Sequence, residues 1–131
     1  MANLTKLATA SVDINTAKLL PPVSGVFAGE AIDLLAPCHI NVDGTVHMSA
    51  STGTVGAIGE YVGFAPAAYA LGEAVTLFGK GLRFSYGAAL VEGKLLYISA
   101  TPGALSDAVV ISSDVSPIAR VITPTDILVI R

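Results

Sequence analysis

The stretch Cys38–Met48, with the sequence CHINVDGTVHM, decides the fold class because it predicts a β-hairpin. Asp43-Gly44 is a strong hairpin signal, and two loop lengths compete. A two-residue loop would mix apolar and polar side chains on both faces. A three-residue loop, Val42–Gly44, gives a clean amphipathic hairpin with Gly44 in the left-handed position, so we predict that register. It pairs Cys38, His39 and Ile40 with Met48, His47 and Val46, leaving His39, Asn41, Thr45 and His47 on the polar face.

The same stretch contains the only cysteine and both histidines, so it is also the first candidate for a metal or catalytic cluster. In the predicted register Cys38 points to the core and is expected to be a small buried hydrophobe. His39 and His47 face each other across the strands, where we expect an exposed polar pair. Zinc sites need about three or four protein ligands, and no third ligand lies at a matching position. We therefore expect no metal and no cofactor. A small β-barrel enzyme using either histidine stays open as an alternative.

The rest of the chain repeats the pattern of short strands. Thirteen glycines and seven prolines punctuate short runs of Val, Ile, Leu and Tyr. Helical periodicity is weak and allows a turn or two at most, at residues 65–71 or 85–91. Three related phrases begin with glycine: GEAIDLL at Gly29, GEAVTLFG at Gly72 and GKLLYIS at Gly93. We predict an all-β body over residues 25–131 with two related halves, about 25–80 and 81–131.

The C-terminal strand is apolar on both faces. In ITPTDILVIR, Ile127 and Val129 share one face, while Leu128 and Ile130 share the other. A strand that is apolar on both faces is buried on both. We therefore predict that these four residues meet the core on one side and a neighbouring subunit on the other.

The first 24 residues differ from the body. Pro21-Pro22 lies close to their end, where the backbone must be extended and stiff. We interpret residues 1–24 as an extended N-terminal arm that adds along a neighbouring chain's sheet edge; a disordered tail is the alternative. The apolar residues expected to make its contacts are Leu4, Leu7, Val12, Ile14, Leu19 and Leu20.

Composition indicates a protein that buries surface against partners. The chain is 53% hydrophobic but only 13% charged, so it should leave apolar surface exposed, as an oligomer or a subunit of a larger assembly does. The net charge is −3 and the basic residues are scattered, which argues against nucleic acid. No apolar run approaches the roughly 18 residues of a membrane span, and no secretory signal is seen. We expect synthesis in the cytoplasm.

Motifs for catalysis are missing from the sequence. The glycine-rich stretch GTVGAIGEYVG has neither dinucleotide-binding nor phosphate-loop spacing, and no serine sits in a nucleophile elbow. We expect no enzymatic activity. A glycan-binding surface would need exposed aromatic residues, for which Tyr69 and Tyr86 are the weak candidates.

Three segments together resemble a known family. They are AGEAIDLLAPCHINVDGTVHMS, VGAIGEYVGFAPAAYALGEAVTLFGKG and VEGKLLYISATPGALSDAVV, the last followed by PIARVITPTDILVIR. They are similar to capsid decoration (cement) proteins of tailed bacteriophages, and the resemblance covers about residues 25–131.

The resemblance implies a compact β-barrel or β-tulip-like body and a homo-oligomer, often a trimer. It implies binding to the major capsid protein on the outer capsid surface of the virion, after synthesis in the host cytoplasm, and no catalysis. The alternative we carry is a β-rich receptor- or glycan-binding module on the virion.

Overall fold

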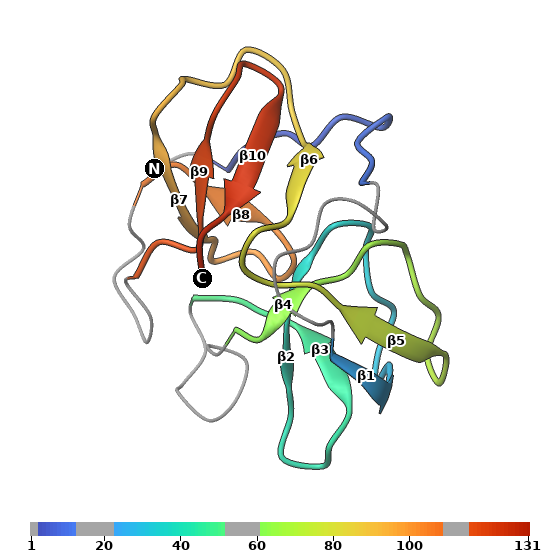
Figure 1. The fold of residues 1–131 in the computed structure, drawn as a ribbon. Helices are drawn as coiled ribbons and strands as arrows, with labels where there is room; N and C mark the ends of the chain where they lie inside the picture. The colour runs from blue at the N-terminus through green and yellow to red at the C-terminus, as the bar shows by residue number, and fades with distance from the viewer. Residues whose placement is uncertain (1–2, 13–22, 52–60, 109–115) are drawn as a thin grey trace.

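A computed structural model describes residues 3–12, 23–51, 61–108 and 116–131 of the chain. These residues form ten short β-strands and no helix, which confirms the predicted all-β class (Figure 1). The short helical turns considered at 65–71 and 85–91 are absent from this part of the chain. Tyr69 instead makes an isolated antiparallel bridge with Ile32, because glycine and proline keep these connections extended or turned.

The first lobe contains five strands in two sheets (the lower half of Figure 1). Strands β1 and β5 form a two-stranded antiparallel sheet, and β3, β2 and β4 form a three-stranded sheet in that order. Single bridges, Ala28–Val46 and Phe64–Phe78, connect the two sheets. The strands are β1 (Val23–Phe27), β2 (Pro37–Ile40), β3 (Val46–Met48), β4 (Gly63–Phe64) and β5 (Ala74–Leu77).

The second lobe is one antiparallel sheet of five strands in the order β6-β10-β9-β7-β8. The C-terminal strand is therefore an inner strand, with β6 and β9 on either side of it. The strands are β6 (Arg83–Ser85), β7 (Leu95–Ile98), β8 (Leu105–Ser106), β9 (Ala119–Val121) and β10 (Asp126–Val129). The three sheets of the described strands are not closed into a barrel.

Each lobe has its own hydrophobic cluster. The first is built within residues 28–77 from small and branched side chains such as Ile32, Cys38 and Val75. The second lies under the five-stranded sheet and holds most of the buried aromatic rings, including Phe84 and Tyr86. Three residues of the first lobe also join this second cluster, so the two lobes share an apolar boundary: Leu35, Phe64 and Phe78.

The β2–β3 hairpin forms in the predicted register. Cys38 pairs with Met48, His39 with His47 and Ile40 with Val46, and Gly44 has a φ of 83°. Cys38 is buried in the core, as expected. The predicted exposed histidine pair is wrong in one member, because His39 is buried while His47 stays partly accessible. The hairpin face with His39 and His47, which the alternating sequence pattern predicts to be polar and exposed, is partly covered in this fold.

Candidate functional site

The hairpin cluster offers neither a metal site among the described residues nor a reactive thiol. Among the described residues, no group of three His, Cys, Asp or Glu side chains could hold a metal. Burial raises the pKa of the Cys38 thiol to about 12, with the Glu30 carboxylate adding to the effect. A thiol with so high a pKa stays protonated and is a poor nucleophile. The structure thus gives Cys38 a packing role.

The polar residues of the hairpin instead fasten it to the loop after β1. His47 Nε2 lies 3.0 Å from Thr45 Oγ1, and His47 Nδ1 lies 3.8 Å from Glu30 Oε1. The Met48 amide donates to Glu30 Oε2 at 2.8 Å. Gly29 packs so closely on Thr45 and His47 that a Cβ at this position would overlap both side chains. This network, here called the clasp, places a carboxylate beside His47, where the sequence predicted none. Sequence reasoning missed it because Glu30 is distant from the hairpin in the chain.

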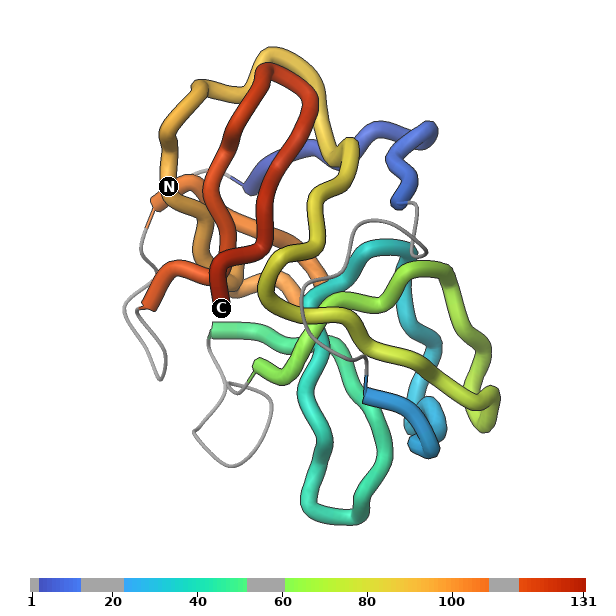
Figure 2. The backbone as a smooth tube through the Cα atoms, viewed as in Figure 1, coloured from blue at the N-terminus to red at the C-terminus, as the bar shows by residue number. Residues whose placement is uncertain are grey.

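Residues 3–12, here called the N-terminal strap, lie along the second lobe of their own chain (Figure 2). Asn3 makes a bridge to Ser106 in β8, and Ser11 makes one to Ser85 in β6. Strands β6 and β8 are the two edges of the five-stranded sheet, so the strap reaches from one edge to the other. Covering sheet edges in this way prevents them from pairing with other chains.

Side chains hold the strap as well as backbone bonds. Ala10 is buried in the second cluster, with Leu4 and Val12 packed against it. The Leu7 amide donates to the Tyr86 carbonyl at 2.8 Å. Lys6 Nζ donates to the Leu34 carbonyl, and partial burial lowers the pKa of this lysine against the opposing effect of Asp33.

Of the six residues predicted to make the arm's contacts, three therefore lie on the body of the same chain: Leu4, Leu7 and Val12. The other three, Ile14, Leu19 and Leu20, fall outside the described residues.

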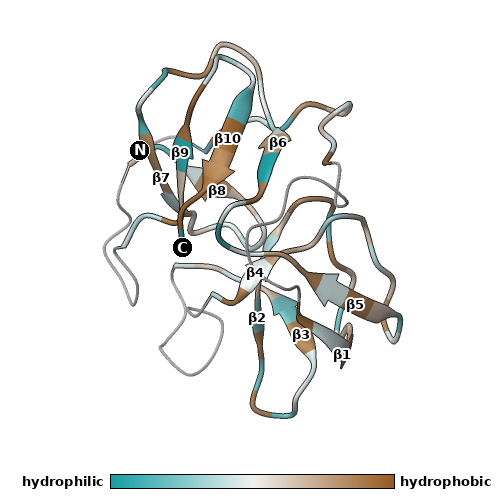
Figure 3. Ribbon diagram, in the orientation of Figure 1, coloured by the Kyte–Doolittle hydropathy of each residue, from teal (hydrophilic) through white to brown (hydrophobic). Residues whose placement is uncertain are grey.

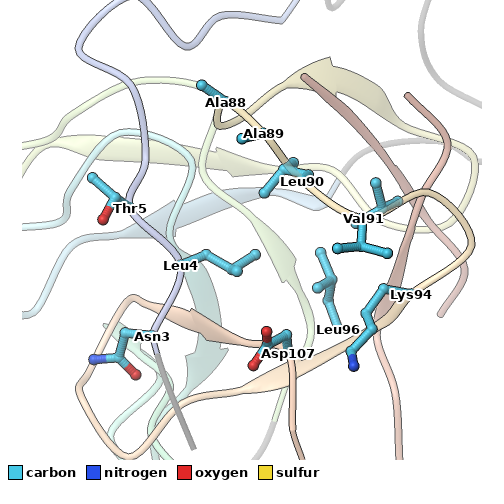
Figure 4. A pocket seen from close by; sticks show the side chains of 11 residues that line it. Asn3, Leu4, Thr5, Ala88, Ala89, Leu90, Val91, Lys94, Leu96 and Asp107 are labelled. Atoms are coloured by element: carbon cyan, nitrogen blue, oxygen red, sulfur yellow. The ribbon is translucent and has the colours of Figure 1, made fainter. Parts of the chain in front are cut away.

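A hollow of about 210 Å³ lies between the strap and the sheet. Leu4 projects into it from the strap, opposite Leu96 and the turn that carries Leu90 (Figure 4). Lys94 and Asp107, which carry opposite charges, also line it. Such a hollow accepts a small apolar group, but its lining offers no nucleophile paired with a general base. It is lined by Asn3, Leu4, Thr5, Ala88, Ala89, Leu90, Val91, Lys94, Leu96, Asp107 and Val121.

The predicted subunit-interface residues divide between the two faces of β10. Ile127 and Val129 are fully buried in the chain's own core and present no surface to a neighbour. Leu128 and Ile130 are half-buried and keep accessible surface on the outer face of the sheet. Of the two tyrosines considered for glycan binding, Tyr86 is buried and Tyr69 is half-buried, so neither forms an open aromatic platform.

The outer face of the second sheet carries a cross-strand row that the sequence did not reveal. Leu128 in β10 lies between Arg83 in β6 and Arg120 in β9, and Arg120 is followed by Leu95 in β7. Figure 3 shows apolar β10 flanked by hydrophilic segments in β6 and β9. The alternation of apolar and basic residues in ARV and RFS was a signal for this face, but the strand order was needed to place the two arginines on either side of Leu128.

Comparison with protein-family models finds no match, and comparison with curated protein sequences finds none that is significantly similar. Within the part of the chain that the structure describes, no helix is long and apolar enough to cross a bilayer.

Proposed function

We propose that this protein is a structural component of a tailed-bacteriophage virion that binds the outer capsid surface and clamps adjacent major capsid proteins. The observation that carries the proposal is the apolar surface on a protein with little charge. Val42, Leu71, Val91 and Phe27 are 90%, 71%, 68% and 55% exposed, and they lie on both lobes. On a chain with only 13% charged residues, these exposed side chains support a role in binding other proteins.

The proposal assigns three contributions to assembly. The arm adds to a neighbouring chain's sheet edge through main-chain hydrogen bonds, a mode of pairing that the strap makes with β6 and β8 of its own chain. Half-buried apolar residues of β10 contribute to contacts between copies in a homo-oligomer, which we propose to be a trimer. Repeated weak contacts around a closed oligomer then give avidity for a lattice.

We propose that the body of each chain is compact and barrel-like or tulip-like. Two single bridges, Ala28–Val46 and Phe64–Phe78, link the sheets of the first lobe in a circuit. In the second lobe the strap reaches both sheet edges. These links support a near-closed arrangement in each lobe. No catalytic role, cofactor or nucleic acid is part of the proposal.

Co-sedimentation with capsids tests the proposal. Purified protein is mixed with undecorated, expanded capsids of the phage that encodes it, and unexpanded procapsids serve as the control. Saturable binding to expanded capsids at a fixed ratio to the major capsid protein is the expected result. Absence of binding to either particle would overturn it, and the glycan-binding alternative would then be tested on a glycan array.

A further inference from the structure

We propose that the tip of the β2–β3 hairpin, Val42–Gly44, docks on the outer face of the five-stranded sheet of a second copy of this chain. The inference rests on the self-association included in the proposed function and names the two surfaces that would carry it. The tip lies at the end of the β2–β3 hairpin that points away from the second sheet (Figure 1). It cannot reach that sheet within one chain, so the contact must join two copies.

The tip is a rigid feature that presents an apolar side chain beside a carboxylate. Val42 is the most exposed large apolar residue described, and nothing in a β-turn requires valine at this position. Asp43 Oδ1 accepts hydrogen bonds from the Thr45 amide at 3.0 Å and from the Thr45 hydroxyl at 2.7 Å. These bonds hold the turn in one conformation. Docking would therefore restrict few additional torsion angles and cost little conformational entropy.

The receiving face offers the complementary groups. Leu128 lies between the two arginines of the cross-strand row, which are about 10 Å apart because each strand adds roughly 4.8 Å. Arg83 already pairs with Asp126 at 3.2 Å. Arg120 donates to the Gly93 carbonyl at 2.9 Å, and within the described residues it has no carboxylate partner. An exposed cation therefore adjoins half-buried leucines.

Docking would place Val42 on Leu128, and would bring Asp43 to Arg120 on the neighbouring strand. The two lobes also differ in net charge. Residues 23–79 hold no basic and five acidic residues, whereas residues 80–131 hold five basic and four acidic residues. The first lobe of one copy and the second lobe of the next are thus electrostatically complementary. Because the two surfaces differ, the contact is head-to-tail and generates a ring or a chain of copies.

Mixing two full-length variants tests the contact. The tip variant is Val42→Ser with Asp43→Asn, which keeps an oxygen to accept the Thr45 bonds. The face variant is Leu128→Thr with Arg120→Glu. The matched control is Val91→Ser with Glu92→Gln, an exposed valine–acid pair at another site. Circular dichroism checks that each variant is folded, and sedimentation velocity measures association over a series of concentrations.

We expect the wild type and the control to associate and each variant alone to associate at least about tenfold more weakly. An equimolar mixture of the two variants retains one intact tip and one intact face, so it should form a heterodimer and nothing larger. The inference is overturned if either variant associates as the wild type does, if the mixture stays monomeric, or if the wild type itself is monomeric. Capsid co-sedimentation of the same proteins is read separately, so that a failed contact with normal capsid binding leaves the proposed function standing.

Discussion

One position in the clasp between the hairpin and the loop after β1 has no room for a larger side chain. Gly29 touches Thr45 and His47 from the side where a Cβ would project. We predict that Gly29→Ala lowers the free energy of unfolding by about 1–3 kcal/mol through overpacking. Urea unfolding measures the change. Gly79→Ala is the control because its nearest neighbour would be an ordinary 3.7 Å away, and equal effects of the two substitutions would contradict the prediction.

Buried thiol and phenol groups with raised pKa values make the folded protein less stable at alkaline pH. The Cys38 thiol ordinarily has a pKa of 9.0, and the folded protein raises it to about 12. Between these values the unfolded chain has lost the proton while the folded chain keeps it, so stability falls as pH rises. The loss is about 1.4 kcal/mol per pH unit for one such group. Tyr86, which burial also raises to a pKa of about 12, adds to the fall above its ordinary 10.0.

Cys38→Ala isolates the contribution of the thiol. We expect the free-energy difference between wild type and variant in urea unfolding to narrow as pH increases from 9.0 towards 12, since only the wild type loses the thiol's contribution. Parallel pH profiles would show that Cys38 is not the titrating group.

At the scale of elements, the strap depends on one small buried residue. Ala10 is buried against the second cluster, whereas Ala8 two residues earlier is exposed. We predict that Ala10→Glu unseats the strap, because a buried unpaired carboxylate is costly, while Ala8→Glu does not. The readout is hydrogen exchange at the Ser85 amide, which donates to the Ser11 carbonyl. Faster exchange in Ala10→Glu alone is expected, and unchanged exchange would contradict the role of Ala10.

The elements also show what the sequence could and could not predict. The hairpin register was predictable because Asp43-Gly44 and the alternation around it act over a few residues. The burial of His39 was not, since it depends on distant parts of the chain that cover the polar face. The same limit applies to the strap: an apolar N-terminal segment signals that it will bind a surface, but Leu4 and Val12 do not specify which one.

For the whole molecule, the two lobes should unfold together. Phe64 belongs to β4 in the first lobe, yet its ring packs in the second cluster, 5.4 Å from the Phe84 ring and 5.8 Å from the Tyr61 ring. Its backbone also exchanges hydrogen bonds with Phe78, at 2.7 and 3.0 Å. A fully buried aromatic residue from a first-lobe strand therefore packs in the core of the second lobe. Nothing in the sequence distinguishes Phe64 from the other phenylalanines.

Phe64→Ala tests this coupling. We predict a loss of about 3–5 kcal/mol of unfolding free energy, because a large buried ring leaves a cavity that neither lobe can fill alone. Methyl NMR signals of Val75 in the first lobe and Leu96 in the second should lose intensity at the same, lower urea concentration. Phe27→Ala is the control, since Phe27 is mostly exposed and its removal should change little. If only the Leu96 signal responds to Phe64→Ala, the lobes are independent folding units, and the apolar boundary between them contributes no cooperativity.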